Sequence, residues 1–126
     1  MNRTEILQKE IESDLDVLDN MGKYLYILSL GKELPAMNVQ DKTEENLVKD
    51  CHSAVWMTKR WKNGVLSLSP DSDTLIVRGL LDILYQLANG RTRQEVKSIT
   101  IFEREDLKFF FPGSRGCGFS AILRSL

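Results

Sequence analysis

The segment 54–69 reads AVWMTKRWKNGVLSLS and constrains the fold more than any other part of the chain. Its first half is rich in Val, Trp and Thr, residue types that favour strands. The pair Asn63-Gly64 follows, and this dipeptide is the strongest short signal for a tight hairpin turn. After the turn, Leu66 and Leu68 alternate with polar residues and therefore face the same side of a strand. The sequence predicts a β-hairpin over residues 54–69.

A lone hairpin is not stable in water, so helices must cover one of its faces. The best candidate is residues 74–89, where apolar side chains recur at helical spacing: Ile76, Leu80, Ile83, Leu84 and Leu87. A narrow polar edge on this helix is formed by Arg78, Asp82 and Gln86. The four residues before the helix, 70–73, are predicted to form a turn that also supplies its N-cap. We interpret the acidic pair within it, Asp71 and Asp73, as solvated charges.

Helices are also predicted on both sides of this central unit. Residues 4–19 carry one apolar stripe (Leu7, Ile11, Leu15, Leu18), and residues 20–34 carry another (Met21, Tyr24, Leu25, Leu28). Gly31 is interpreted as the C-terminal stop of the second helix. The polar segment 36–50 is predicted to be a long surface loop with one helical turn around 43–47. A capping-box pattern from Thr92 to Glu95 predicts a short helix, and Ser114 is the expected cap of a last one.

Helices on both sides of one hairpin indicate an α+β class: a small antiparallel sheet with helices packed against it. The length of 126 residues and the lack of a linker predict a single domain over residues 1–126. Seventeen Lys and Arg against 18 Asp and Glu give a net charge of -1, which argues against nucleic-acid binding and polybasic membrane docking. The opening MNRTEILQKEIESD has no apolar leader, so we expect a cytoplasmic protein with reduced thiols.

Cys51 is the strongest candidate for chemistry. A structural free cysteine normally sits in an apolar run, but this one lies between Lys49-Asp50 and His52-Ser53 at the predicted junction of loop and strand. Lys49 and His52 would lower the pKa of its thiol, and Asp50 would oppose them. His52 is the only histidine and is adjacent in sequence, so it is poorly placed as a general base. A Cys/His hydrolase is therefore not expected.

Other sites have weaker support. One histidine and two cysteines 66 positions apart give no spaced ligand pair, so no metal site is predicted. Cys117, between two glycines, is interpreted as a packing residue near the start of a helix. Trp56 and Trp61 are interpreted as core or interface residues.

The thiol segment has the pattern N-x-V-x-D-C-x-S-x-V-W, with Asn46, Val48, Cys51, Ser53, Val55 and Trp56 at its defined positions. Further distinctive segments follow in order: Asp71-Ser72-Asp73, then Ile76 to Leu80 with a basic residue at Arg78, then Thr92 to Glu95, and Ser114-Arg115 with Gly118. In these segments the chain resembles the SufE-type sulfur acceptors, the cysteine desulfuration proteins of iron–sulfur cluster assembly, whose thiol motif is N-x-V-x-G-C-x-S-x-V-W. Asp50 stands where the family has Gly.

The resemblance implies a fold like that of the scaffold protein IscU and a role as a sulfur acceptor. Cys51 would take persulfide sulfur from a pyridoxal-phosphate cysteine desulfurase of the SufS type, stimulate that enzyme, and pass the sulfur to an iron–sulfur scaffold complex. The protein would itself be no enzyme and would bind no cofactor, nucleic acid or membrane. The other residues implied in the thiol loop and its partner contact are Asn46, Val48, Asp50, His52, Ser53, Trp56, Asp73 and Arg115.

Three alternatives stay open at this stage. The chain could be an enzyme with Cys51 as nucleophile, which would need a base and turnover without a partner protein. It could be a binding module that regulates a desulfurase without carrying sulfur. It could also serve a paralogous desulfurase in another sulfur pathway.

Overall fold

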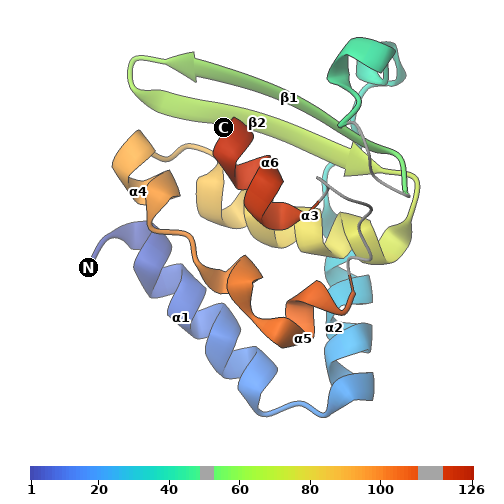
Figure 1. The fold of residues 1–126 in the computed structure, drawn as a ribbon, viewed down its shortest axis with the longest axis vertical. Helices are drawn as coiled ribbons and strands as arrows, with labels where there is room; N and C mark the ends of the chain where they lie inside the picture. The colour runs from blue at the N-terminus through green and yellow to red at the C-terminus, as the bar shows by residue number, and fades with distance from the viewer. Residues whose placement is uncertain (49–52, 111–117) are drawn as a thin grey trace.

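The predicted hairpin is present in the computed structural model, which describes residues 1–48, 53–110 and 118–126 (Figure 1). Strand β1 (Val55–Lys62) pairs antiparallel with β2 (Val65–Ser72), with Lys62 opposite Val65 next to the turn. Asn63 and Gly64 have φ angles of 54° and 75°. Two consecutive positive φ values are what a type I′ hairpin turn requires, so this dipeptide sets the register of the sheet.

Strand β2 runs further than the sequence indicated. Residues 70–72 continue the strand, with Pro70 opposite Met57 and Asp71 opposite Trp56, so the turn predicted over 70–73 is wrong. A proline is tolerated there because both strands of a two-stranded sheet are edge strands. The outer side of an edge strand pairs with no neighbour and therefore needs no N–H donor. The N-cap of the following helix is Thr74, and its side chain makes no capping hydrogen bond.

Helix α3 (Leu75–Ala88) lies under the hairpin at the centre of the molecule (Figure 1). Its apolar side chains form the core with those of β2, where Leu66 and Leu68 face the helix side as predicted. Burying one such leucine stabilises the fold by roughly 1.5–3 kcal/mol. This arrangement confirms the α+β class with a small antiparallel sheet covered by helices.

Helices α1 (Arg3–Asp16) and α2 (Asn20–Glu33) form at the predicted places, but α2 turns a different face inward. Met21, Tyr24 and Leu25, predicted as its apolar face, are 64%, 41% and 56% exposed. Its buried residues are Ile27 and Gly31. The predicted face was wrong because the sequence shows where apolar residues lie but not which ones can approach a neighbouring helix.

Gly31 lies within α2 and does not stop it. A Cβ atom built on Gly31 would lie 2.3 Å from the carbonyl oxygen of Leu75, and one on Gly79 would lie 1.9 Å from that of Ile27. Both distances are far below a normal contact, so glycine is required wherever these two backbones meet. The two glycines therefore allow α2 to pack directly on α3, and they explain the buried face.

The remaining elements are short: η1 (Val39–Asp41), η2 (Glu44–Asn46), α4 (Arg93–Lys97), η3 (Ile101–Glu103), α5 (Glu105–Lys108) and α6 (Phe119–Ser125). The predicted turn around 43–47 corresponds to η2, and the capping box from Thr92 to Glu95 is confirmed. The rings of Phe102 and Phe119 stack with centroids 4.3 Å apart and join α6 to η3. Ser114, the expected cap of the last helix, lies outside the described residues. None of the described helices is long and apolar enough to span a bilayer.

Replacing Gly79 with Ala tests the close approach of α2 and α3. The added methyl group meets backbone that cannot move aside alone, so we expect Gly79→Ala to lower the free energy of unfolding by about 3 kcal/mol or more. Urea denaturation followed by circular dichroism measures this. Ser29→Ala, at an exposed position of α2, is the matched control and should change stability by less than about 0.5 kcal/mol. Equal stability of Gly79→Ala and wild type would contradict the packing described.

Candidate functional site

The residues of the thiol motif that the structure describes gather at the end of the hairpin away from its turn. Val48 precedes residues 49–52, and its backbone N–H donates to the carbonyl oxygen of Val55 at 2.7 Å. Leu47 forms an isolated antiparallel bridge with Trp56. The chain leading to the predicted nucleophile is therefore held against the first residues of β1.

The chain leaving that segment is held by the strand-to-helix junction. The backbone N–H of Ala54 donates to Asp73 Oδ1 at 3.2 Å. The carbonyl oxygen of Ala54 accepts from the Ser72 hydroxyl at 2.7 Å. The Thr74 hydroxyl donates to Ser53 Oγ at 3.0 Å. Asp73, predicted to orient the thiol loop, thus contacts Ala54, the residue immediately before β1. Both flanks of residues 49–52 are anchored to the same end of the hairpin.

Asn46 stabilises the loop that leads into this end. Its side-chain amide donates to the carbonyl oxygen of Asp41 at 2.7 Å and so links η2 to η1. Neighbouring Lys42 places its ammonium group 5.2 Å from the centre of the Trp56 ring, within the range of a cation–π contact. The motif residues Asn46 and Trp56 therefore both help to position the loop 36–48 on the hairpin.

The carboxylate of Asp71 is the electrostatic centre of this region, and it is 1% exposed. It accepts hydrogen bonds from the backbone N–H groups of Met37 and Ser72 at 3.1 and 2.7 Å. It also forms ion pairs with Arg78 and, at 3.4 Å, with Lys42. Burial by itself would raise the pKa of Asp71, but these hydrogen bonds and the two cations outweigh it, so the pKa is lowered.

Arg78 extends this network to the end of α2. Its guanidinium donates to the carbonyl oxygens of Gly31 and Leu34 at 3.0 and 2.6 Å, in addition to Asp71. These carbonyls belong to the last turn of a helix, where intrahelical donors are lacking and cations are favoured. Arg78 thus joins α3, α2 and β2 directly behind the thiol end of the hairpin.

The role of Asp71 was missed from sequence. We interpreted Asp71 as a solvated charge in a turn, and that interpretation is wrong because the strand continues and carries it inward. Arg78 was assigned to a polar edge of the central helix, with no partner named. The signal that could have identified the pair is a single arginine among the apolar residues of that helix, since a charge in such a place needs a buried counter-ion.

Seven residues singled out from sequence lie outside the described parts of the chain: Lys49, Asp50, Cys51, His52, Ser114, Arg115 and Cys117. Their predicted roles stay predictions. Of the site residues predicted from sequence, the structure brings together Asn46, Val48, Ser53, Trp56 and Asp73. Within the described ranges, no three His, Cys, Asp or Glu side chains are grouped so that they could hold a metal ion. The arrangement anchors both flanks of residues 49–52, a short segment that contains the thiol of Cys51.

Comparison with known families agrees with the family resemblance drawn from the sequence. A family model described as the SufE, Fe-S metabolism associated domain matches residues 9–126. The match includes both anchored flanks, the hairpin, α3 and the Asp71–Arg78 pair.

Asp71→Asn tests the buried network. Removing one partner leaves Arg78 with an uncompensated charge, so the free energy of unfolding at pH 7 should fall by about 3 kcal/mol. Because the pKa of Asp71 is lowered on folding, its ionised form stabilises the protein above its unfolded pKa of about 3.9, and this contribution is lost as the pH falls through the lower folded pKa. The stability difference between wild type and Asp71→Asn should therefore shrink below about pH 4.

Urea denaturation at a series of pH values measures this difference. Asp41→Asn, at an exposed position in η1, is the control and should be nearly neutral throughout. A stability difference between wild type and Asp71→Asn that is small at pH 7, or that does not shrink below about pH 4, would contradict the role given to the Asp71 carboxylate.

Proposed function

We propose that this chain, which belongs to the SufE family associated with Fe–S metabolism, is a sulfur carrier. The proposed sulfur acceptor is Cys51. The observation that carries the proposal is the joint anchoring of Val48 and of Ser53-Ala54 at one end of the hairpin. A carrier must present one thiol to two different proteins in turn. Fixing both flanks of a short segment is a direct way to present it.

The proposed transfer begins at a persulfide on a pyridoxal-phosphate cysteine desulfurase. The Cys51 thiolate attacks the terminal sulfur, a new S–S bond forms to Cys51, and the S–S bond to the desulfurase cysteine breaks. The desulfurase thiolate leaves and takes up a proton, so the step involves no net oxidation or reduction. Its rate depends on the thiolate fraction, the nucleophilicity and the accessibility of Cys51. The sulfur then passes to an iron–sulfur scaffold complex.

In this proposal the protein is an accessory sulfur-transfer protein and not an enzyme, and it stimulates the desulfurase by removing its product. The proposal places the protein in the cytoplasm, where thiols are kept reduced. A regulator that carries no sulfur, and an acceptor for a paralogous desulfurase, are the competing functions that the first experiment separates.

The first experiment is the intact mass of the protein after incubation with a cysteine desulfurase and cysteine. We expect the mass to increase by one or more sulfur atoms, and the addition to be reversed by a reductant. Cys51→Ser should gain no sulfur, whereas Cys117→Ser, which keeps Cys51, should gain it as wild type does.

Two outcomes would overturn the carrier function. Sulfur addition that persists in Cys51→Ser but is lost in Cys117→Ser would show that the acceptor is Cys117 and not Cys51. Undiminished stimulation of the desulfurase by Cys51→Ser, with no sulfur on the wild-type protein, would identify a regulator. Activity with only one of several desulfurases from the same cell would identify the pathway.

Asp50→Gly tests the one position of the thiol motif where this chain differs from its family. Glycine reaches backbone angles that Asp adopts less readily, and the substitution removes a negative charge next to the thiol. We expect Asp50→Gly to accept sulfur faster than wild type in a single-turnover assay with the persulfidated desulfurase. Asp50→Asn, which removes only the charge, separates the two causes. An unchanged or slower rate for Asp50→Gly would contradict the prediction.

A further inference from the structure

The hairpin has two outer edges, and the edge on the side of β2 is covered by the protein itself. The backbone N–H of Leu66 donates to the carbonyl oxygen of Arg91 at 2.9 Å, and the carbonyl oxygen of Leu66 accepts from the N–H of Gly90 at 2.7 Å. The next outward-facing N–H, that of Leu68, donates to Asn89 Oδ1 at 2.9 Å. The chain between α3 and α4 therefore satisfies the outward backbone groups of β2.

The edge on the side of β1 is paired only where the strand begins. There the carbonyl oxygen of Val55 accepts from the N–H of Val48 at 2.7 Å. In an antiparallel pair, every second residue directs its N–H and C=O to the partner strand and the residues between direct theirs away from it. Because Lys62 closes the two-residue turn as a hydrogen-bonded pair, Lys59 and Trp61 direct their backbone groups outward, as Val55 does.

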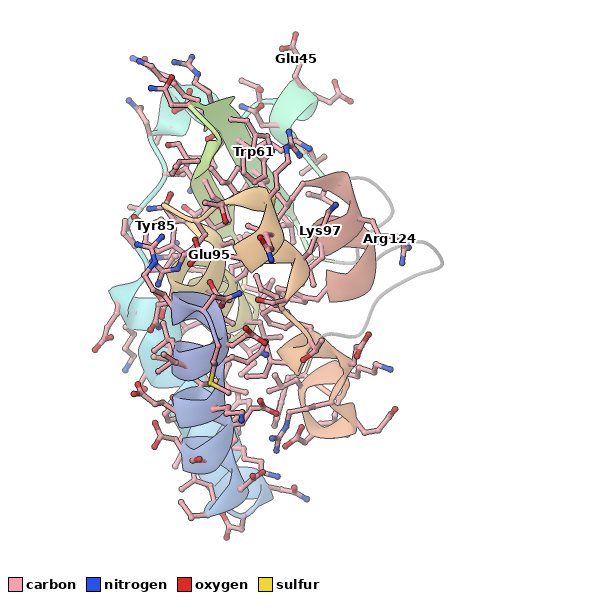
Figure 2. All side chains as sticks on the ribbon, turned by 90° about the vertical axis from the view of Figure 1, so that its left-hand side faces the viewer. Glu45, Trp61, Tyr85, Glu95, Lys97 and Arg124 are labelled. Carbon is pink, nitrogen blue, oxygen red and sulfur yellow. The ribbon has the colours of Figure 1, made fainter. Side chains whose placement is uncertain are left out.

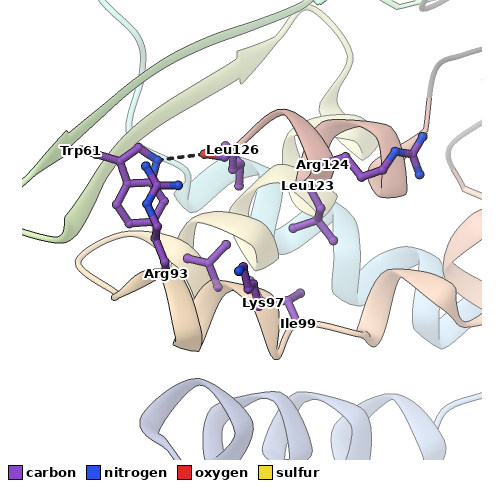
Figure 3. A pocket seen from close by; sticks show the side chains of 8 residues that line it. Trp61, Arg93, Lys97, Ile99, Leu123, Arg124 and Leu126 are labelled. Carbon is purple, nitrogen blue, oxygen red and sulfur yellow. Dashed lines mark hydrogen bonds between the residues drawn. The ribbon is translucent and has the colours of Figure 1, made fainter.

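These outward backbone groups have no partner within residues 1–48, 53–110 and 118–126. Neither the N–H nor the carbonyl oxygen of Lys59 or Trp61 forms a hydrogen bond there. In Figure 1 this edge of β1 forms the upper margin of the molecule between the turn and the loop with η1 and η2. The Trp61 side chain does not cover it, because its indole N–H donates to Leu126 at 2.8 Å on the side of α6 (Figure 3). A free edge of this kind is a template for a further strand.

The side chains along this edge are cationic. Lys59, Arg60 and Lys62 are all exposed, and because side chains alternate along a strand, they place positive charge on both faces of the sheet. Among the described residues, none of the three forms an ion pair with a carboxylate. Glu45 on the neighbouring η2 points away from the body of the molecule (Figure 2). The free edge therefore carries a positive charge that the described part of the chain does not neutralise.

This charge determines which strand the edge can accept. Antiparallel pairing with β1 of a second copy would bring the cations of the two edges close to one another, and like charges opposite each other destabilise a sheet. Lysines on an edge strand commonly protect a protein from such self-association. Opposite charges across two strands stabilise their pairing instead. The edge thus disfavours another copy of this chain and favours an acidic strand.

We propose that residues 58–62 of β1 bind an extended acidic segment of a partner protein, which adds to the sheet as an antiparallel strand. The backbone groups of Lys59 and Trp61 would supply the hydrogen bonds, and the three cations would select the partner's side chains. The antiparallel direction is that of Leu47, which already forms an antiparallel bridge with Trp56 at the same edge. The inference does not rest on the sulfur-carrier function.

The test is an NMR titration of the full chain with the capped peptide EVEEV, whose residues in order lie opposite Lys62 to Thr58. We expect saturable shifts and slower hydrogen exchange at the backbone amides of Lys59 and Trp61. The amides of Thr58 and Arg60, which already donate to β2, are the internal reference. At low ionic strength, the neutral peptide QVQQV should bind at least about tenfold more weakly.

N-methylated peptides separate strand pairing from attraction between charges. The second and fourth peptide residues, opposite Trp61 and Lys59, direct their N–H groups to β1, so methylating both amides should weaken binding by about tenfold or more. Methylating only the third amide, which points away from β1, should change the affinity by less than about twofold. Equal affinity of the two methylated peptides would overturn strand addition.

Charge variants of the protein complete the test. The triple variant Lys59→Gln/Arg60→Gln/Lys62→Gln should weaken EVEEV binding by about tenfold or more. Lys9→Gln/Lys32→Gln/Lys97→Gln removes the same charge from exposed positions elsewhere and should bind as wild type does. Circular dichroism checks that both variants are folded.

Three further outcomes would overturn the proposal. They are the absence of saturable shifts, equal binding by the two triple variants, and protection of the Lys59 and Trp61 amides that rises with protein concentration without peptide. The last would assign the edge to a second copy of this chain. Neither a desulfurase nor a persulfide is present in this experiment, so its failure and the failure of the sulfur-carrier function are distinguishable.

Discussion

The buried carboxylate of Asp71 is the interaction on which the thiol end of this molecule depends. It holds the backbone of Met37 and Ser72 and the side chains of Arg78 and Lys42. Through these groups it joins β2, α3, the end of α2 and the loop that leads to the thiol motif. A buried anion of this kind persists only when every acceptor site finds a donor, so the four elements must come together as one unit.

The hairpin serves different purposes at its two ends. At the strand-to-helix end, its first residues anchor both flanks of the segment with the predicted nucleophile. At the turn end, the indole N–H of Trp61 donates to Leu126 and ties the hairpin to α6. Helix α3 underlies both ends, and the glycine contact with α2 fixes its position from the other side.

Much of the candidate site could be predicted from the order of residues, because its motif is local. Val48, Ser53 and Trp56 lie within a few positions of Cys51, so any fold that forms the hairpin brings them to its end. The partners Asp71 and Arg78 were beyond that reasoning. Whether Asp71 is a solvated turn residue or a buried strand residue depends on how far β2 continues, and that depends on what packs beside it.

The sequence by itself determined the hairpin, its turn and its register, because Asn63-Gly64 adopts positive φ angles that few other pairs accept. It also determined that α3 is central and that the class is α+β, since the apolar period of α3 is unambiguous. Only the tertiary structure decided which face of α2 is buried. Counting apolar residues favours Met21, Tyr24 and Leu25, but Gly31 and Gly79 let two backbones touch, and close packing at one point outweighs a wider apolar stripe elsewhere.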